Sequence, residues 1–198
     1  MFAYISGKLV VKSEGFVVID AGGIGYKIFM SESSLSKLEE VGSTVKVHTH
    51  YYVREDNISL YGFYSADELR MFELLLSVSG IGAKSAIAML SAISPSEFAL
   101  AIISNDISKL TKIPGIGAKT AQRIVLELKD KLKTEEGISK GEKIESVIGQ
   151  NKNIEEAVAA LKVLGYGKRE IDEAISKVGA DNVELESIIK KALIYLSR

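Results

Sequence analysis

The sequence contains no cysteine and no tryptophan, and its 198 residues include only two prolines and two histidines. Without cysteine the chain forms no disulfide and offers no thiolate metal ligand, which suits a reducing cytoplasm. No apolar run reaches the ~18 residues that a membrane-spanning helix needs. The N-terminal residues also lack the charged and then apolar pattern of a secretory signal. We therefore expect a cytoplasmic protein that is not embedded in a membrane.

Patterns of catalytic residues are missing as well. The chain shows no Ser/His/Asp or Cys/His arrangement and no dense carboxylate cluster suited to two-metal nuclease chemistry. His48 and His50 share one face of an expected strand, but without cysteines or carboxylates close by they are expected to have an ordinary surface or interface role. The sequence thus predicts no catalytic residue, no metal and no cofactor.

The most informative pattern is a repeated pentapeptide, Gly-Ile-Gly-Ala-Lys, at Gly80–Lys84 and again at Gly115–Lys119. Each copy follows an apolar, helix-like stretch and precedes another, so the layout is helix, tight turn, helix, twice over. A single copy could be only a tight connection between helices. Two copies in the same register indicate a duplicated supersecondary unit and favour a function.

The chemistry of such a turn points to phosphate. A glycine-rich turn that opens a helix presents bare backbone N–H groups, and the helix dipole favours an anion at that end. The lysine four residues later adds a full positive charge. The layout resembles the helix-hairpin-helix motif, which holds the sugar-phosphate backbone of DNA or RNA without reading bases.

A nucleotide-binding P-loop is the rival interpretation of these glycines. Its pattern requires a glycine directly before the lysine, where this chain has Ala83 and Ala118. It also requires a glycine five residues earlier, where Val78 and Ile113 stand, and no hydrophobic strand leads into either turn. The sequence therefore predicts that the chain does not hydrolyse ATP itself.

The charge of the chain is nearly balanced, at −1 overall. Only the expected helical segment 64–134 has a positive balance, with nine basic against seven acidic residues. Such a small excess implies that affinity for nucleic acid comes from focused backbone donors or from several copies of the chain acting together.

Hydrophobic periodicity divides the chain into four parts and predicts an α+β multidomain fold. Residues 1–63 alternate like short strands around one helix at 33–40, as in a small barrel of the OB type, although another small β-barrel would show a similar pattern. Residues 64–134 are helical and contain the repeat. Residues 135–152 are polar and punctuated by glycine, which predicts a flexible linker. Residues 153–198 have the apolar spacing of a three-helix bundle.

This order of parts resembles the RuvA family of bacterial Holliday-junction proteins. Beyond the two pentapeptides, the run Thr49–Asp56 with Leu60–Phe63 is similar to a hairpin of that family, and Ala21–Tyr26 is similar to its glycine turn. Ala160–Tyr166 resembles the opening of its C-terminal bundle, which is related to ubiquitin-associated domains. The resemblance covers the chain outside the linker.

The resemblance implies a homotetramer that holds a four-way DNA junction open and square, independently of sequence. It leaves open whether one tetramer or two stacked tetramers bind the junction. It also implies recruitment of the hexameric ATPase RuvB, and it makes the junction resolvase RuvC a further candidate partner. The DNA-binding residues that it implies are Ser79, Gly80, Gly82, Ala83, Lys84, Ser85, Pro114, Gly115, Gly117, Ala118, Lys119, Thr120 and Arg123.

Two acidic residues, Glu55 and Asp56, stand at the tip of the expected hairpin. Taken alone they are ordinary turn residues. The resemblance implies instead that they form a pin at the centre of the tetramer, facing the crossover. Acids placed there would repel phosphates across a distance comparable to the ~8 Å Debye length at physiological salt. Such repulsion would favour junctions over continuous duplex.

The last motif lies in the C-terminal bundle, where the resemblance implies that RuvB binds. Its candidate residues are Leu161, Leu164, Gly165 and Tyr166. Because a small bundle needs most of its apolar residues for its core, we expect Ala157 and Leu161 to be buried. We expect Leu164 and Tyr166 to be exposed as a docking patch.

Two alternatives from other classes remain open. Helix-hairpin-helix modules also serve DNA glycosylases, ligases and nucleases, but these enzymes need a catalytic centre that the sequence does not supply. A barrel that binds single strands could instead stack bases on aromatic rings. Its candidate platforms are Tyr51, Tyr52, Tyr61 and Phe63.

Overall fold

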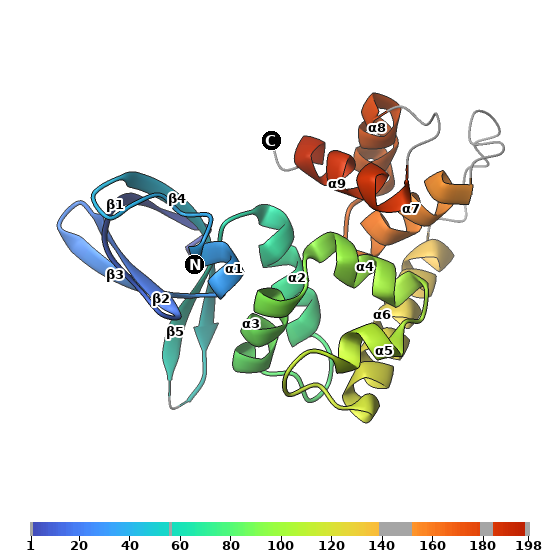
Figure 1. The fold of residues 1–198 in the computed structure, drawn as a ribbon, viewed down its shortest axis with the longest axis horizontal. Helices are drawn as coiled ribbons and strands as arrows, with labels where there is room; N and C mark the ends of the chain where they lie inside the picture. Colours follow the sequence, from blue (N-terminus) through green and yellow to red (C-terminus); the bar gives the residue numbers. More distant parts are fainter. Residues whose placement is uncertain (1, 56, 139–151, 179–183, 197–198) are drawn as a thin grey trace.

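The computed structural model describes residues 2–55, 57–138, 152–178 and 184–196, and it shows a β-barrel followed by two groups of helices (Figure 1). The barrel sits apart at one side of the molecule, and the helices form the other side. This arrangement confirms the predicted fold class, with a five-stranded barrel, tandem helix-hairpin-helix units and a C-terminal helical domain.

The barrel closes in the strand order β1-β2-β3-β5-β4. Only β3 and β5 pair in parallel, and the other neighbouring strands are antiparallel. Because side chains alternate along a strand, every second residue points into the barrel, where aliphatic side chains form a separate core. A closed five-stranded barrel fits the predicted OB type. The strands are β1 (Tyr4–Ser13), β2 (Phe16–Ala21), β3 (Ile24–Met30), β4 (Thr44–Val53) and β5 (Ile58–Phe63).

The helix expected at 33–40 is shorter than predicted. Helix α1 covers only Glu32–Leu35, between β3 and β4. Immediately after it, the amides of Lys37 and Leu38 donate to carbonyl oxygens only three residues earlier. Turns of this tight kind are rarely prolonged, so the helix ends there.

The helical segment contains five helices around one core. Serine side chains cap two of them, since Ser65 accepts from the Glu68 amide and Ser94 accepts from the Glu97 amide. Apolar residues from all five helices fill the core, including the fully buried Phe72 and Phe98. The helices are α2 (Ala66–Leu76), α3 (Ala83–Ala92), α4 (Pro95–Ile103), α5 (Ile107–Thr111) and α6 (Ala118–Ile138).

The predicted bounds of the linker, 135 and 152, both differ from the structure. Helix α6 continues to Ile138, and the next helix already begins at Lys152. The extension has a local cause, because the sequence Lys-Leu-Lys-Thr-Glu-Glu at 131–136 consists mostly of strong helix formers. The rest of the predicted linker, at 139–151, lies outside the described residues.

The C-terminal helices are α7 (Lys152–Val163), α8 (Lys168–Val178) and α9 (Leu185–Leu196). They pack on one another, and α7 also packs against α4 and α6. One buried apolar cluster therefore extends from the helical segment into the bundle. A bundle of this size buries little apolar surface alone, so packing against α4 adds to its stability.

No single helix in the described part of the chain is long and apolar enough to cross a membrane. Helices α3 and α4 reach the necessary length and composition only as a pair, across a bend of 98°. Both helices contribute fully buried residues to the core, among them Met89 and Phe98.

The barrel joins the helices through α2, which follows β5 almost directly. The ring of Phe72 on α2 contacts Phe63 and Tyr61 of β5, with centroid distances of 4.9 and 5.3 Å. It also meets the edge of His50 from β4 at 5.3 Å. The hairpin formed by β4 and β5 is thus packed at its base against the first helix of the first repeat.

Candidate nucleic-acid interface

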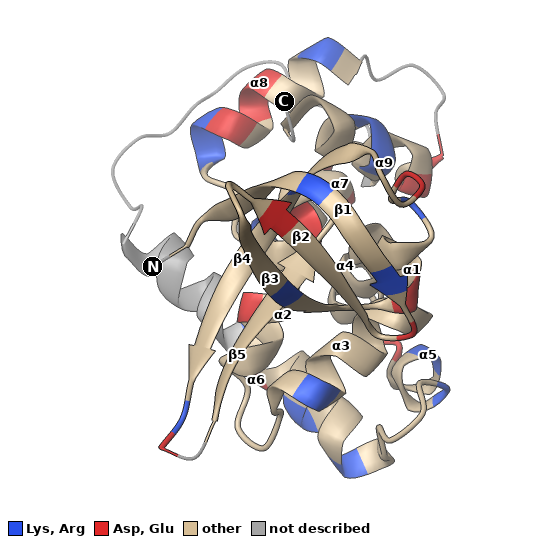
Figure 2. Cartoon of the chain, turned by 90° about the vertical axis from the view of Figure 1, so that its left-hand side faces the viewer, with Lys and Arg blue, Asp and Glu red and all other residues tan. Residues whose placement is uncertain are grey.

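Three loops project toward the same side of the molecule. The tip of the β4–β5 hairpin, the α2–α3 turn and the α5–α6 turn all reach the lower edge in Figures 1 and 2. The two turns contain the repeated pentapeptides, and the hairpin tip contains the predicted acidic pin. Segments far apart in the sequence therefore form one composite surface.

The two pentapeptide turns have the same backbone geometry. Gly80 and Gly115 both have φ of +83°, a left-handed conformation that strains residues with a Cβ atom. In each turn the second residue of the pentapeptide closes back by one hydrogen bond. Ile81 N donates to Val78 O at 3.2 Å, and Ile116 N donates to Ile113 O at 3.1 Å. The duplication inferred from the sequence is thus also a duplication of structure.

Each turn ends at the start of a helix, α3 after the first and α6 after the second. Gly82 is the N-cap of α3, and no side chain caps it. The first amides of the helix are therefore available to an anion. Lys84 and Lys119 are exposed on the first turns of α3 and α6, beside these amides. Since a backbone amide reads no base, the arrangement would position any duplex equally well.

The remaining predicted contacts differ between the two repeats. The Ala83 side chain is buried whereas that of Ala118 is exposed, so Ala83 could contact a phosphate only through its backbone. Ser85 is exposed, and Thr120 is half-buried. The two copies of the repeat thus share the backbone geometry of the turn but differ in how their side chains pack.

Arg123 connects the second repeat to the first. It lies on α6, one turn after Lys119, but its guanidinium Nη1 donates to the carbonyl of Ser79 at 3.2 Å. The same group lies beside Gly80, 3.2 Å from where a Cβ atom would be. Arg123 thus adds its charge to the first turn rather than to the second, which the sequence did not reveal.

Glu127, one helical turn after Arg123, was also missed by sequence reasoning. Its carboxylate accepts a hydrogen bond from the Ser79 amide at 3.2 Å. The equivalent position in the second repeat is Pro114, which has no N–H and needs no acceptor. Helix α6 therefore holds Ser79, at the start of the first turn, through both its carbonyl and its amide.

At the hairpin tip, Glu55 is exposed, while Asp56 lies outside the described residues. The preceding Arg54 is held against Tyr52. Its guanidinium lies 5.0 Å from the ring centroid, and its Nε donates to the Tyr52 hydroxyl at 2.8 Å. The hairpin tip thus presents a held cation directly before Glu55, and Figure 2 shows a basic and an acidic segment at this tip.

The aromatic residues proposed as stacking platforms are partly hidden. Tyr61 and Phe63 are buried, and their rings pack against Phe72 in the joint between barrel and helices. They cannot stack on bases while this joint is intact. The structure therefore contradicts these two residues as platforms, because the outer face of β5 is covered by α2.

The expectation that Leu164 and Tyr166 are exposed was wrong. Leu164 is 0% exposed and Tyr166 is 4% exposed, and Leu161 is buried as predicted. Gly165 is exposed, but its carbonyl accepts a hydrogen bond from Arg70 of α2 at 2.9 Å. An apolar helix face looks the same in sequence whether its own bundle or a neighbouring domain covers it.

Tyr166 is tied to α2 by a polar contact as well as by packing. Its hydroxyl donates to Oδ1 of Asp67, and the Arg70 guanidinium lies 4.1 Å from its ring centroid. Burial raises the pKa of Asp67, against the effect of the tyrosine hydrogen bond. Burial and then the Asp67 contact raise the pKa of Tyr166, so the proton stays on the phenol.

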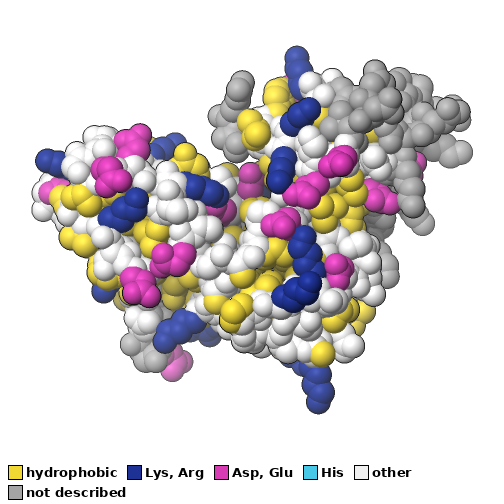
Figure 3. All heavy atoms as spheres, in the orientation of Figure 1, with side chains coloured by type: hydrophobic (Ala, Val, Ile, Leu, Met, Phe, Trp, Pro, Cys, Tyr) yellow, Lys and Arg dark blue, Asp and Glu magenta, His cyan; other side chains and the backbone are white. Residues whose placement is uncertain are grey.

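Charges on the broad face of the molecule are mixed. In Figure 3, basic and acidic side chains alternate with apolar ones across the helices, and a basic side chain projects from the lower edge.

The two histidines have separate surroundings. His50 is paired with Glu73 at 3.1 Å, and burial lowers the pKa of His48. Within the described residues, no three His, Cys, Asp or Glu side chains are grouped to hold a metal ion.

Comparison with known proteins extends over the whole chain. Family models match three segments: the RuvA N terminal domain at residues 1–62, a SAM-like helix-hairpin-helix tandem at 72–130, and the RuvA C-terminal domain at 152–197. The Holliday junction branch migration complex subunit RuvA of Acetivibrio thermocellus is 50% identical over 201 residues, which cover 100% of both chains. The proteins of the same name from Ruminiclostridium cellulolyticum and Clostridium botulinum are 47% and 43% identical, over 98% and 100% of both chains.

Proposed function

The chain belongs to the RuvA family, and on that premise we propose that it is the DNA-binding subunit of a Holliday-junction branch-migration complex. It holds a four-way junction open and square, without chemistry of its own, during recombination and DNA repair. The relatives that share its full length carry the name of such a subunit.

One observation carries the proposal. The two pentapeptide turns, which have equal backbone geometry, and the hairpin tip with Glu55 lie on one side of the molecule. Phosphate contacts alone would hold any duplex. An acid at the hairpin tip would repel a backbone that crosses it, so the combination favours DNA whose strands diverge at that point.

We propose a homotetramer, with Glu55 and Asp56 of each copy near its centre. A four-way junction has four equivalent arms, so four copies can each hold one arm with the same contacts. The charge balance agrees with this assembly, because a net charge of −1 makes a single copy a weak polyanion binder. Repeating the same few contacts raises the overall affinity through avidity.

The motor is proposed to be a separate protein, the RuvB ATPase, in a bacterial cytoplasm. The C-terminal bundle would recruit it, and the resolvase RuvC would follow on the same junction. Leu161, Leu164 and Tyr166 are buried, and Tyr166 is hydrogen-bonded to Asp67 of α2. Among the large apolar residues of the bundle that the structure describes, Ile194 on α9 is the exposed one, at 62%. We therefore place the RuvB contact on the outer face of α9.

A competition experiment tests the proposed function. A labelled synthetic four-way junction is bound by the full chain and challenged with linear duplex or single strands of the same sequences, with magnesium and without ATP. We expect a strong preference for the junction, with no cleavage and no strand opening. Equal binding to junction and duplex would leave only a general duplex binder, and cleavage would indicate an enzyme.

A further inference from the structure

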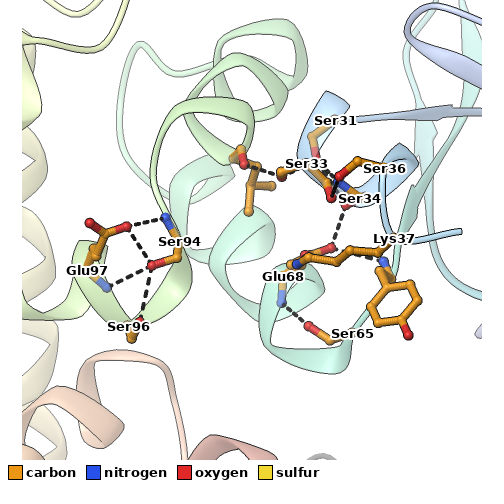
Figure 4. Close-up of polar contacts among 12 residues, drawn as sticks. Ser31, Ser33, Ser34, Ser36, Lys37, Ser65, Glu68, Ser94, Ser96 and Glu97 are labelled. Carbon is orange, nitrogen blue, oxygen red and sulfur yellow. Dashed lines mark hydrogen bonds and ion pairs between the residues drawn. The ribbon is translucent and has the colours of Figure 1, made fainter. Parts of the chain in front are cut away.

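A short segment of the barrel is hydrogen-bonded to both helices of the first repeat (Figure 4). We call residues 31–37, which include α1, the serine bracket. Ser33 Oγ donates to the Leu90 carbonyl of α3 at 2.7 Å, and the Glu32 amide donates to Ser91 Oγ at 3.2 Å. The other end of the bracket contacts α2. The two helices that flank the first pentapeptide turn are therefore attached to the barrel at their ends away from that turn, α2 at its start and α3 at its end.

Glu68 is the centre of the contact with α2. This residue of the first turn of α2 is only 2% exposed. Its carboxylate accepts hydrogen bonds from Ser34 Oγ at 2.5 Å and from the Tyr64 amide at 3.0 Å. It also pairs with Lys37 Nζ at 2.6 Å. Figure 4 shows Ser34 and Lys37 reaching Glu68 from the bracket.

The apolar and polar contacts of this joint have different consequences. The packing of Phe72 against β4 and β5 holds barrel and helices together, but hydrophobic contact has little directional preference. Hydrogen bonds weaken steeply when their angles change. A buried carboxylate that loses its donors also pays a large desolvation cost. The hydrogen bonds of Glu68 thus favour one angle between the barrel and the first repeat.

We infer that Glu68 is a positioning residue for junction recognition. By holding the serine bracket, it fixes where the hairpin tip lies relative to the first phosphate-binding turn. Phosphate binding needs only the helical segment, whereas discrimination of a junction needs the acids of the hairpin at a defined place beside that segment. The inference rests on the proposed function, but it concerns selectivity and not affinity.

The test compares two matched variants. Glu68→Gln removes the negative charge at nearly constant volume. Glu97→Gln is the control, because Glu97 contacts Ser94 and Lys109, which both lie within the helical segment. Glu97 accepts from Ser94 Oγ at 2.7 Å (Figure 4) and pairs with Lys109 at 3.3 Å. We expect Glu68→Gln to lower the ratio of junction to duplex affinity by about tenfold, as for loss of a charge-assisted hydrogen bond. The ratio should fall because duplex binding tightens when the hairpin acids no longer oppose a continuous duplex, and the ratio for Glu97→Gln should stay unchanged.

A second readout measures the distance between the hairpin and the helical segment directly. Because the chain has no cysteine, spin labels can be attached at Asn57→Cys on the hairpin and Lys112→Cys after α5, with labelled chains diluted into unlabelled ones. Glu68→Gln should broaden the distance distribution between the labels, and Glu97→Gln should not. Ser34→Ala removes one donor and serves if Glu68→Gln fails to fold, with an expected drop of about threefold in the ratio.

The outcomes separate this inference from the proposed function. An unchanged ratio in a folded Glu68→Gln protein would overturn the positioning role, as would an equal loss in Glu97→Gln. A wild-type protein that does not prefer junctions would refute the proposed function instead. In that case the label distances decide whether Glu68 positions the barrel, and an unchanged distribution would refute it.

Discussion

The guanidinium of Arg123 donates to the carbonyl of Ser79 at 3.2 Å, although the two residues belong to different repeats and lie 44 positions apart. Glu127, on the same helix, accepts from the Ser79 amide. Helix α6, which starts at the second turn, therefore also fixes the first. The two pentapeptide turns are parts of one unit, because helix α6 begins at the second turn and is hydrogen-bonded to the start of the first.

Arg123→Ala removes a positive charge from the first turn and releases the Ser79 carbonyl. We expect junction and duplex binding to fall together by about tenfold at low salt, because phosphate contacts do not distinguish the two. Fluorescence anisotropy with both DNAs measures this. Arg169→Ala, which removes an exposed arginine from α8, is the control and should bind as the wild type does. A selective loss of junction binding would contradict a pure phosphate role.

The two repeat lysines should act additively on the salt dependence. Lys84→Ala and Lys119→Ala each remove one exposed ammonium group from the start of a helix. Each should reduce the slope of log affinity against log salt by about one, for every copy of the chain that contacts DNA. Titrations between low and physiological salt give the slopes. A lysine whose removal leaves the slope unchanged does not contact a phosphate.

Neutralising the acids of the hairpin should strengthen binding to plain duplex DNA. In the double variant Glu55→Gln with Asp56→Asn, repulsion of a crossing backbone is lost, so binding to plain duplex should tighten. The same competition between junction and duplex measures the preference, which should fall. The predicted effect should also shrink at high salt, since screening already weakens the repulsion of the wild type. An unchanged preference for junction over duplex would refute the proposed role of Glu55 and Asp56 as a pin.

The sequence was sufficient for those features that depend on local chemistry. The turns at Gly80 and Gly115 were predictable because a left-handed backbone favours glycine and because the same residues recur in register. The barrel and the hairpin followed from alternating apolar residues bounded by turn residues. In each case the residues that make the structure are neighbours in the sequence.

Contacts between distant segments could not be predicted in the same way. Arg123 has a backbone carbonyl as its partner, and a carbonyl has no side-chain identity that a sequence could display. Tyr166 was expected on a surface because the bundle was treated as an independent unit, whereas α2 covers it. In the sequence, nothing distinguishes Glu68 from other acids in the first turn of a helix, where acids are common. Its burial follows only from the position of the serine bracket.

Tyr166→Phe should weaken the attachment of the C-terminal bundle to α2. The change removes the hydroxyl that donates to Asp67 and leaves a buried carboxylate without that donor. We expect a loss of about 1–3 kcal/mol in the free energy of unfolding, and faster hydrogen exchange in α7 than in β4 and β5. Tyr195→Phe is the matched control, because its hydroxyl donates to Glu173 on the exposed side of the bundle. If the amides of α7 exchange equally fast in Tyr166→Phe and Tyr195→Phe, the attachment of the bundle through Tyr166 is contradicted.

Glu97 should make the stability of the helical segment depend on pH. The Ser94 hydroxyl donates to its carboxylate and is the main cause that holds its pKa below the ordinary value of 4.5, with the Ser94 amide and Lys109 acting in the same direction. A carboxyl whose pKa is lowered on folding stabilises the folded state above its unfolded pKa, and this contribution is lost as the pH falls through the folded pKa.

Urea unfolding of the wild type and of Glu97→Gln, measured from neutral pH downward, tests this sign. At neutral pH the wild type should be the more stable by less than about 1 kcal/mol, because Glu97 and Lys109 are partly exposed and solvent screens the pair. The difference should shrink as the pH falls below the unfolded pKa and vanish in acid. Ser94→Ala removes the largest cause of the shift and should give a similar loss of pH dependence. A difference between wild type and Glu97→Gln that is the same at all pH values would mean that the charge of Glu97 contributes nothing and that only its shape matters.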